Sequence, residues 1–453
     1  MMRLRLGQVR DWTGGTLEHV DASQIVRKMT IDSRDAAPDV LFVALAGTKT
    51  DGHVFVQEVW ALGGMAMVRD DFPDSGGPAL RVASPLEAMG RLLRRYLDEH
   101  QVTVVGVTGS VGKTSVKELS AAVLRQRFVT TSSLGNYNTA IGLPLSFFAG
   151  NPDATHFVAE MGMRGLGEIQ HLTEIAPPQV AVISSIGPSH LEMMGSMEAI
   201  QQAKGEILTG LRPDGVAVLN GDNAWVRELG QRTSHRVVWF GRCEDADVRI
   251  ESSTVEENGT DIQLTAWGAS TWVHLPWLGD HHAYNVAAAL LVGRALGMGR
   301  EESVAGIEAV DRSNSRIRVV SIGTMTVLED VYNSSPLSSQ AALDVLASRS
   351  GRRIAVLGDM LELGSYEVAG HQEIGAYALG RADQLLAVGP RAHHTYEAGR
   401  QAGLTSIWAA TRQEAVAWLK ATLKPGDVVL LKASRGMEFE RITEALLEWG
   451  AQL

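Results

Sequence analysis

The sequence predicts an α/β protein of three domains, and three observations lead to this expectation. The chain has 453 residues, more than one compact core usually holds, so its length alone predicts two or three domains. Short, continuous apolar runs, typical of strands buried on both faces of a parallel sheet, alternate with helix-like stretches. One Thr-rich segment with period-two patterning interrupts this alternation, and a further α/β unit begins after it.

The first predicted domain is a small α/β unit. Residues 1–100 mix short apolar runs, such as residues 40–45, with Gly and Asp turns, and they end in a helix-like stretch at residues 85–100. A length of about 100 residues is typical of one small domain. We therefore expect an N-terminal α/β domain over residues 1–100.

The second predicted domain, residues 101–313, begins with the apolar run 102–107. A helix is expected next, because apolar residues recur at three- and four-residue spacing: Val116, Leu119 and Val123. Further candidates for buried parallel strands are residues 157–159, 180–183 and 216–219. The Thr-rich residues 248–276 are expected to form an antiparallel appendage to this sheet.

The third predicted domain, residues 314–453, is a Rossmann-like α/β unit at the C-terminus. Apolar runs again alternate with helical patterns, at residues 326–328, 354–357, 385–388 and 428–431. Breaks near residues 100 and 313 give three domains of ordinary size.

Composition and charge narrow the class of protein. The net charge of −11 argues against a nucleic-acid partner or an anionic membrane surface, which select for a broad basic face. A single Cys rules out an internal disulfide and fits a reducing compartment. The N-terminus lacks a signal-peptide pattern, and the most apolar helical stretch, residues 286–296, is too short to span a bilayer. We expect a cytoplasmic monomer without membrane insertion.

One segment carries the pattern of a phosphate-binding loop: Thr108-Gly109-Ser110-Val111-Gly112-Lys113-Thr114. Gly109 and Gly112 allow backbone N–H groups to turn toward an anion. Lys113 adds positive charge, and Thr114 offers a hydroxyl to Mg²⁺. The strict pattern has Gly where this chain has Val107, so the loop is a shorter variant; an ordinary turn and helix cap is the alternative. Nucleotide binding is the stronger hypothesis, but the loop alone does not distinguish a ligase from a GTPase, a motor or a kinase.

Three further residues are candidates for metal chemistry. Glu160 follows the apolar run 157–159, and His190 follows the run 180–183, so both are expected at the carboxyl edge of the sheet, where a carboxylate and an imidazole could bind Mg²⁺ or Mn²⁺. Each could equally be a solvated or hydrogen-bonded side chain. Lys204 interrupts an apolar helical stripe, which fits either a snorkelling side chain or a desolvated, chemically modifiable amine.

Together these residues resemble the Mur ligases of peptidoglycan synthesis. The phosphate loop, the series Glu160, His190 and Lys204, and residues 279–285, Gly-Asp-His-His-Ala-Tyr-Asn, carry the resemblance. Four segments are similar to the subfamily that adds D-alanyl-D-alanine: residues 358–364 with His371, 330–333, 430–436, and 31–34 with 51–53. The resemblance spans nearly the whole chain.

The resemblance implies an ATP-dependent reaction. ATP phosphorylates the terminal carboxylate of UDP-N-acetylmuramoyl-tripeptide, and the amine of D-alanyl-D-alanine attacks the resulting acyl phosphate. It also implies that CO₂ carbamylates Lys204 and that two Mg²⁺ ions are held by Thr114, Glu160, His190 and the carbamate. Lys113 then has a catalytic role beside Glu160 and His190.

By the same resemblance, the remaining site residues have binding roles. Asn285 matches an adenine contact, and Arg316 and Asp330 match third-domain groups that reach ATP. Ser33 and Arg34 match the region that binds the UDP moiety. Residues facing the muramoyl peptide are Asn136, Asn138 and Thr139, and those near the incoming dipeptide are Asn333, Lys432, Ser434 and Arg435.

The chain departs from the family pattern at two places, and three alternative functions remain open. The chain has Ser334-Ser335-Pro336 where the family commonly has Ala-Asn-Pro, and His282 where Asn is also common. A sister ligase for another amino acid, or a folylpolyglutamate synthetase, would share the fold and the phosphate chemistry. A regulatory P-loop protein that makes no amide bond is an alternative of a different class.

Overall fold

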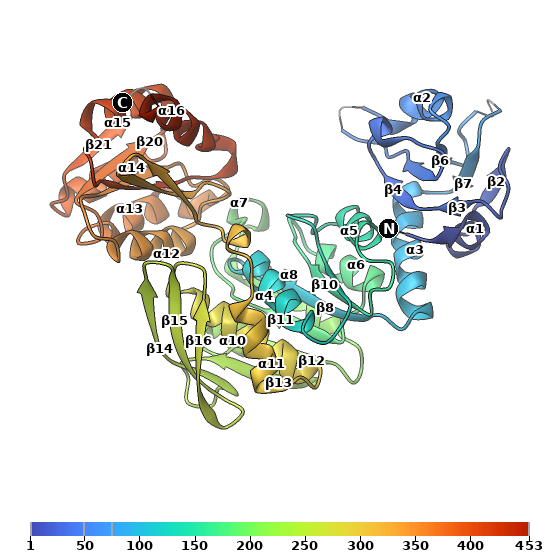
Figure 1. Cartoon of the computed structure of the whole chain (residues 1–453), viewed down its shortest axis with the longest axis horizontal. Helices are drawn as coiled ribbons and strands as arrows, with labels where there is room; N and C mark the ends of the chain where they lie inside the picture. The colour runs from blue at the N-terminus through green and yellow to red at the C-terminus, as the bar shows by residue number, and fades with distance from the viewer. Residues whose placement is uncertain (1, 49, 74–75, 452–453) are drawn as a thin grey trace.

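The computed structural model describes residues 2–48, 50–73 and 76–451, which form three α/β bodies, each around its own sheet (Figure 1). The N-terminal and C-terminal bodies lie on opposite sides of the central one (Figure 1). The predicted fold class is thereby confirmed, while the limits of the domains remain a prediction.

The N-terminal body contains a five-stranded sheet of order β2-β7-β6-β5-β4, parallel except for β2. Its strands are β2 (Thr16–Glu18), β4 (Lys28–Thr30), β5 (Val40–Val43), β6 (Met65–Arg69) and β7 (Ala79–Val82). Beside it lie the pair β1 (Leu4–Arg5) and β3 (Ile25–Val26) and the helices α1 (Leu6–Thr13), α2 (Val56–Ala61) and α3 (Pro85–Glu99). The Ser84 hydroxyl caps α3, which packs on α1 and on two helices of the central body, α5 (Gly142–Ala149) and α6 (Glu168–Ile175).

The central body contains a nine-stranded sheet of order β16-β15-β14-β13-β12-β11-β8-β10-β9. Its strands are β8 (Thr103–Thr108), β9 (Thr130–Ser132), β10 (His156–Glu160), β11 (Val180–Ile183), β12 (Val216–Asn220), β13 (Arg236–Gly241), β14 (Val248–Glu256), β15 (Gly259–Ala266) and β16 (Ala269–Leu275). The strands from β8 to β14 are parallel, and β14 to β16 form the predicted antiparallel appendage. The remaining helices are α4 (Lys113–Leu124), α7 (Leu191–Met194), α8 (Met197–Thr209), α9 (Ala224–Arg232), α10 (His282–Ala295) and α11 (Arg300–Glu308).

Strand register brings the candidate residues of the central body to one edge of its sheet. Glu160, the last residue of β10, lies beside Val107 of β8, and Ile183 of β11 lies beside Thr108. The loops that follow β8, β10 and β11 therefore start side by side, at the carboxyl edge where open α/β sheets bind ligands.

The C-terminal body contains a six-stranded sheet of order β17-β18-β22-β19-β20-β21, parallel except for β17. Its strands are β17 (Arg318–Ile322), β18 (Met325–Asp330), β19 (Arg353–Gly358), β20 (Gln384–Val388), β21 (Ser406–Ala409) and β22 (Val428–Lys432). Its helices are α12 (Pro336–Ala347), α13 (Glu367–Tyr377), α14 (His393–Gln401), α15 (Arg412–Thr422) and α16 (Glu440–Gly450). The β14–β15 hairpin reaches this body, where Arg349 donates a hydrogen bond of 3.2 Å to the carbonyl of Glu257.

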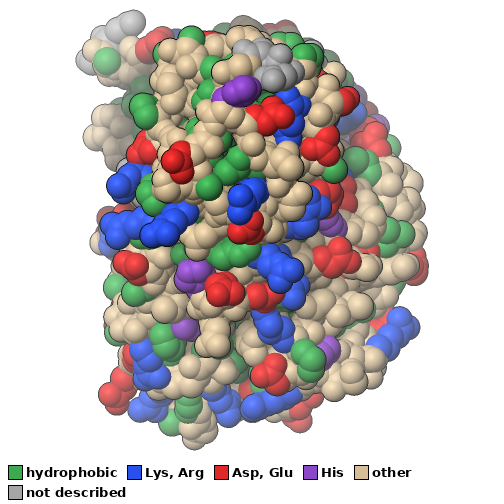
Figure 2. All heavy atoms as spheres, turned by 90° about the vertical axis from the view of Figure 1, so that its right-hand side faces the viewer, with side chains coloured by type: hydrophobic (Ala, Val, Ile, Leu, Met, Phe, Trp, Pro, Cys, Tyr) green, Lys and Arg blue, Asp and Glu red, His purple; other side chains and the backbone are tan. Residues whose placement is uncertain are grey.

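Figure 2 shows Lys and Arg side chains interspersed with Asp and Glu over the face that the N-terminal body presents, so the visible face is mixed in charge. In the part of the chain that the structure describes, no helix combines the length and apolar character needed to cross a bilayer.

Candidate functional site

A cavity of about 1370 Å³ opens at the carboxyl edge of the central sheet and extends to β18, β22 and α12 of the C-terminal body. Most of the predicted site residues line it: Ser110, Val111, Gly112, Lys113, Thr114, Asn136, Asn138, Thr139, Glu160, His190, Lys204, Asn285, Arg316, Asp330, Asn333 and Lys432. Residues far apart in the sequence thus line the same cavity, which is called the chamber below. Thr108 and Gly109 lie just behind it, at the start of the phosphate loop.

The phosphate loop is held in a fixed shape by its neighbours. The hydroxyl of Ser110 donates to the carbonyl of Gly187 and accepts from its backbone N–H, both at 2.9 Å. Gly112 is the N-cap residue that precedes α4 and has φ 85°, and a Cβ there would lie 2.7 Å from Oδ1 of Asn285, so only glycine fits. The ammonium of Lys113 donates to the carbonyl of Gly109 at 2.7 Å. Desolvation lowers the pKa of Lys113, and the charge of Glu160 opposes this shift.

The carboxylate of Glu160 is held on both sides. The hydroxyl of Thr114 donates to Oε2 at 2.8 Å, and the amide nitrogen of Asn138 donates to Oε1 at 3.0 Å. The backbone N–H of Glu160 donates to the hydroxyl of Ser133 at 3.0 Å. Because Glu160 is only 2% exposed, these bonds set the direction of its carboxylate.

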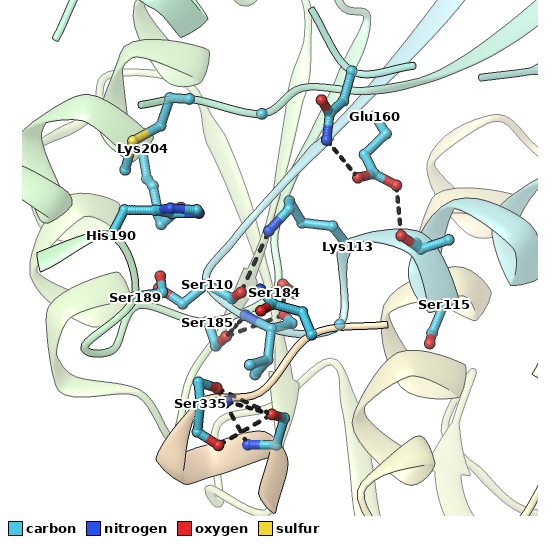
Figure 3. A pocket seen from close by; sticks show the side chains of 18 of the residues that line it. Ser110, Lys113, Ser115, Glu160, Ser184, Ser185, Ser189, His190, Lys204 and Ser335 are labelled. Atoms are coloured by element: carbon cyan, nitrogen blue, oxygen red, sulfur yellow. Dashed lines mark hydrogen bonds between the residues drawn. The ribbon is translucent and has the colours of Figure 1, made fainter. Parts of the chain in front are cut away.

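His190 and Lys204 lie together across the pocket from Glu160 (Figure 3). His190 precedes α7 in the left-handed conformation, with φ 57°. Lys204 is buried on α8, the helix that the Ser196 hydroxyl caps. Burial, and then the charge of Lys113, hold the pKa of Lys204 well below its ordinary value, which favours the neutral form of this amine.

The C-terminal body contributes cations to the cavity. The guanidinium of Arg316 donates to the hydroxyl of Thr114 and lies over the ring of Tyr332, 3.9 Å from its centroid. The ammonium of Lys432 lies 2.8 Å from a carboxylate oxygen of Asp330 and donates to the carbonyl of Asn333 at 2.6 Å. Lys432 thereby fixes the loop after β18.

Four predicted substrate-binding residues lie outside this cavity. Ser33 and Arg34 belong to the N-terminal body, where Arg34 pairs with Asp32 at the surface. Ser434 is buried, and its hydroxyl accepts a hydrogen bond of 2.9 Å from the backbone of Leu361. Arg435 is exposed, 3.4 Å from Glu440. Their predicted roles therefore need the substrate to extend beyond the cavity. The hydrogen bond of Ser434 holds the loop that contains Leu361.

Lys117 is a residue that sequence reasoning missed. It is fully buried on α4, and its ammonium donates to the carbonyls of Ser133 (2.7 Å) and Gly135 (3.4 Å). The carboxylate of Glu118, 2.7 Å away, balances the charge. Lys117 thus ties the phosphate-loop helix to the loop that carries Asn138. Its place among apolar residues of a helix is the same signal that singled out Lys204.

Asn285 belongs to the segment 279–285, whose His282 and Tyr284 are hydrogen-bonded, and the partner of Tyr284, Asp222, is a residue that sequence reasoning missed. The amide nitrogen of Asn285 lies 3.0 Å from Nδ1 of His282. The hydroxyl of Tyr284 donates to Asp222 at 2.9 Å, and burial together with Asp222 raises the pKa of Tyr284 to about 12. Asp222 also accepts from the backbone of Cys243, whose thiol pKa is raised to about 11, by burial first and then by Asp222.

The oxygen groups of this chamber fit a magnesium ion that arrives with a nucleotide. Nowhere in residues 2–48, 50–73 and 76–451 are three His, Cys, Asp or Glu side chains grouped to hold a metal. The side-chain oxygens of Thr114 and Glu160 nevertheless converge at 2.8 Å at the start of α4. Mg²⁺ commonly takes one or two protein oxygens, completing its octahedron with phosphates and water, and this pair suits that demand.

The chain is similar in sequence and in structure to known ligases. Residues 107–293 match the Mur ligase middle domain, and residues 315–435 match the domain described as "Mur ligase, glutamate ligase domain". A UDP-N-acetylmuramoyl-tripeptide–D-alanyl-D-alanine ligase of Bacillus subtilis is 32% identical over 465 residues, which cover 99% of each chain. A crystal structure of MurF from Acinetobacter baumannii superposes with a TM-score of 0.90 at 28% identity, covering 99% of both chains. The ADP complex of MurF from Thermotoga maritima gives 0.84 at 29% identity, covering 94% of this chain and 98% of the other. The chain therefore belongs to the Mur ligase family.

Proposed function

We propose that this chain is an ATP-dependent carboxylate–amine ligase that joins D-alanyl-D-alanine to UDP-N-acetylmuramoyl-tripeptide. The observation that carries the proposal is one chamber in which the phosphate loop, Glu160 and Lys204 of the central body face Arg316 and Lys432 of the C-terminal body. The relatives that align over the full chain bear the name of this ligase. Their agreement in length favours it over folylpolyglutamate synthesis or a regulatory role.

The chemistry follows from the poor reactivity of a carboxylate as an acyl donor. Transfer of the γ-phosphoryl group of ATP to a carboxylate oxygen forms an acyl phosphate and releases ADP. The amine of the dipeptide then attacks the carbonyl carbon, and the tetrahedral intermediate loses phosphate as the amide forms. Lys113 offsets charge on the transferring group, and Thr114 and Glu160 would hold a Mg²⁺ ion that would supply further charge neutralisation.

Lys204 is proposed to act as a carbamate. Its neutral amine attacks CO₂, a C–N bond forms, and one proton leaves to solvent, so a buried amine becomes a carboxylate. Burial of Lys204 beside His190 supports this proposal, because the reactive neutral form is the one that the site favours. The carbamate and His190 would hold a second Mg²⁺.

The substrate roles and the domain assignment are part of the same proposal. Residues 1–100, through Ser33 and Arg34, bind the UDP moiety, and residues 101–313 bind ATP. Asn136, Asn138 and Thr139 face the muramoyl peptide, while residues 314–453 bind the dipeptide through Asn333, Lys432, Ser434 and Arg435. We also expect the protein to act in the cytoplasm, as suits a reaction that consumes ATP.

Phosphate release tests this function. The purified protein is given ATP and Mg²⁺ with UDP-N-acetylmuramoyl-tripeptide, with or without D-alanyl-D-alanine, and the products are identified by mass spectrometry. We expect phosphate release to require both substrates and a product heavier by one D-alanyl-D-alanine less water. Phosphate release that is indifferent to both substrates would mean a non-ligase ATPase, and ligation of another amino acid instead would mean a sister ligase.

A further inference from the structure

The imidazole of His190 contacts the C-terminal body. Its Nδ1 atom lies 2.6 Å from Oε2 of Glu362, in the loop that follows β19. A carboxylate accepts hydrogen bonds, so Nδ1 is the nitrogen that carries a proton here. In a neutral ring, Nε2 is then the nitrogen with a free lone pair.

We propose that Glu362 is a positioning residue: it fixes the tautomer and orientation of His190 from the opposite body, leaving Nε2 free to ligate a metal ion. The inference rests on the proposed function only for the identity of that ion. Carboxylates that hold a ligating histidine in this manner commonly matter to metal affinity.

The backbone at both ends of the contact is unusual. His190 has φ 57° and Glu362 has φ 64°, both in the left-handed region. Residues other than glycine are uncommon there, and such strained positions cluster at functional sites. Two strained residues that meet each other indicate that the surrounding structure is built to hold this pair.

The loop that carries Glu362 lies unusually close to α7. The backbone N–H of Glu192 donates to the carbonyl of Glu362 at 3.3 Å. Gly364 has φ 53°, and a Cβ on it would lie 2.8 Å from Cα of Glu192. Only glycine allows this approach, so the loop is shaped to seat against the helix that follows His190.

Buried groups of the C-terminal body support the same loop from behind. His371 donates from Nδ1 to the carbonyl of Glu367 at 2.7 Å and accepts at Nε2 from the backbone of Met360 at 3.0 Å. The hydroxyl of Ser434 accepts from Leu361, the residue before Glu362. Glu362 is therefore presented on a rigid support, although its own side chain is exposed.

The contact between His190 and Glu362 links the orientation of the imidazole to the position of the C-terminal body. His190 is oriented only while the C-terminal body is seated against α7, because the acceptor for its Nδ1–H belongs to that body. The body proposed to deliver the amine thus completes the metal side of the chamber.

The test compares Glu362→Ala and Glu362→Gln in the full-length protein, with Glu192→Gln as a matched control. Glu192 is an exposed carboxylate at the same contact, but only its backbone takes part. The first readout is the tautomer of His190, from ¹⁵N NMR of the ring nitrogens without nucleotide or metal, assigned with His190→Gln. The second is the affinity for Mn²⁺ in the presence of a non-hydrolysable ATP analogue, from electron paramagnetic resonance.

We expect Glu362→Ala to lose the fixed Nδ1–H tautomer and to weaken Mn²⁺ binding by about 10- to 100-fold, with the far-UV circular dichroism unchanged. Glu362→Gln keeps an acceptor oxygen and should retain most of the tautomer preference, while Glu192→Gln should match the wild type. A wild-type tautomer and wild-type Mn²⁺ affinity in Glu362→Ala would overturn the proposal. Neither readout depends on ligase activity. Failure of the positioning role of Glu362 can therefore be told apart from failure of the proposed ligase function.

Discussion

The side-chain amide of Asn138 donates a hydrogen bond of 3.0 Å to Oε1 of Glu160, from a loop that Lys117 anchors to the phosphate-loop helix. The other carboxylate oxygen accepts from Thr114. The two candidate groups for peptide and metal binding are therefore in direct contact, and a change in one alters the position of the other.

Replacement of Asn138 should slow the reaction without abolishing nucleotide binding. Asn138→Ala frees one oxygen of Glu160, and kcat should fall by about 10- to 100-fold, as for other partners of metal-binding carboxylates. Asn138→Asp should be more severe, since a second carboxylate would face Glu160. Steady-state kinetics check this, with Tyr137→Phe as control, because Tyr137 is an exposed residue of the same loop that does not line the cavity. Equal kcat for Asn138→Ala and Tyr137→Phe would contradict it.

Lys204→Ala should abolish ligation, because neither the amine nor its carbamate remains. Millimolar bicarbonate should not restore the activity, whereas short carboxylic acids should do so in part by supplying a carboxylate to the same space. Phosphate release and product mass measure the outcome. The control is Lys420→Ala, because Lys420 is an exposed lysine of α15 that does not line the cavity, and this variant should keep wild-type activity. Full activity of Lys204→Ala would remove the carbamate from the mechanism.

His156 should make the fold sensitive to acid. Burial lowers its pKa from 6.5 to about 4, so between these values the unfolded chain binds a proton that the folded chain does not. The free energy of unfolding is therefore unaffected by His156 above about pH 6.5 and falls as the pH drops toward 4. His156→Phe, which keeps a ring beside Phe128, should reduce the loss between pH 7 and pH 5 by on the order of 1 kcal/mol. Urea unfolding at both pH values measures this, and an equal loss in both proteins would contradict it.

The sequence was most informative where a segment is buried on both faces. β8 and β11 show continuous apolar runs because helices cover both sides of the parallel sheet, and both were predicted. β9 was missed because its three residues, Thr-Thr-Ser, form a short polar edge strand. β17 was missed because it is an edge strand of the C-terminal sheet and four of its five residues are at least partly exposed.

The sequence likewise predicted only part of the candidate site. The phosphate loop is continuous in sequence, so its spacing was enough to find it. The partners of Ser434 and His190 lie 73 and 172 residues away, and no local pattern reports such contacts. From the sequence, Ser434 is therefore only a candidate for substrate binding, and Glu362 only part of a motif.

Cys243 leaves the chain well suited to site-specific labelling at introduced cysteines. It is the only cysteine in the sequence, and its thiol pKa of about 11 leaves almost no reactive thiolate at neutral pH. Cysteines introduced on the outer surfaces of the central and C-terminal bodies would therefore react selectively with maleimide dyes in the otherwise native chain. Energy transfer between two such dyes could follow the separation of the two bodies through each turnover, one molecule at a time.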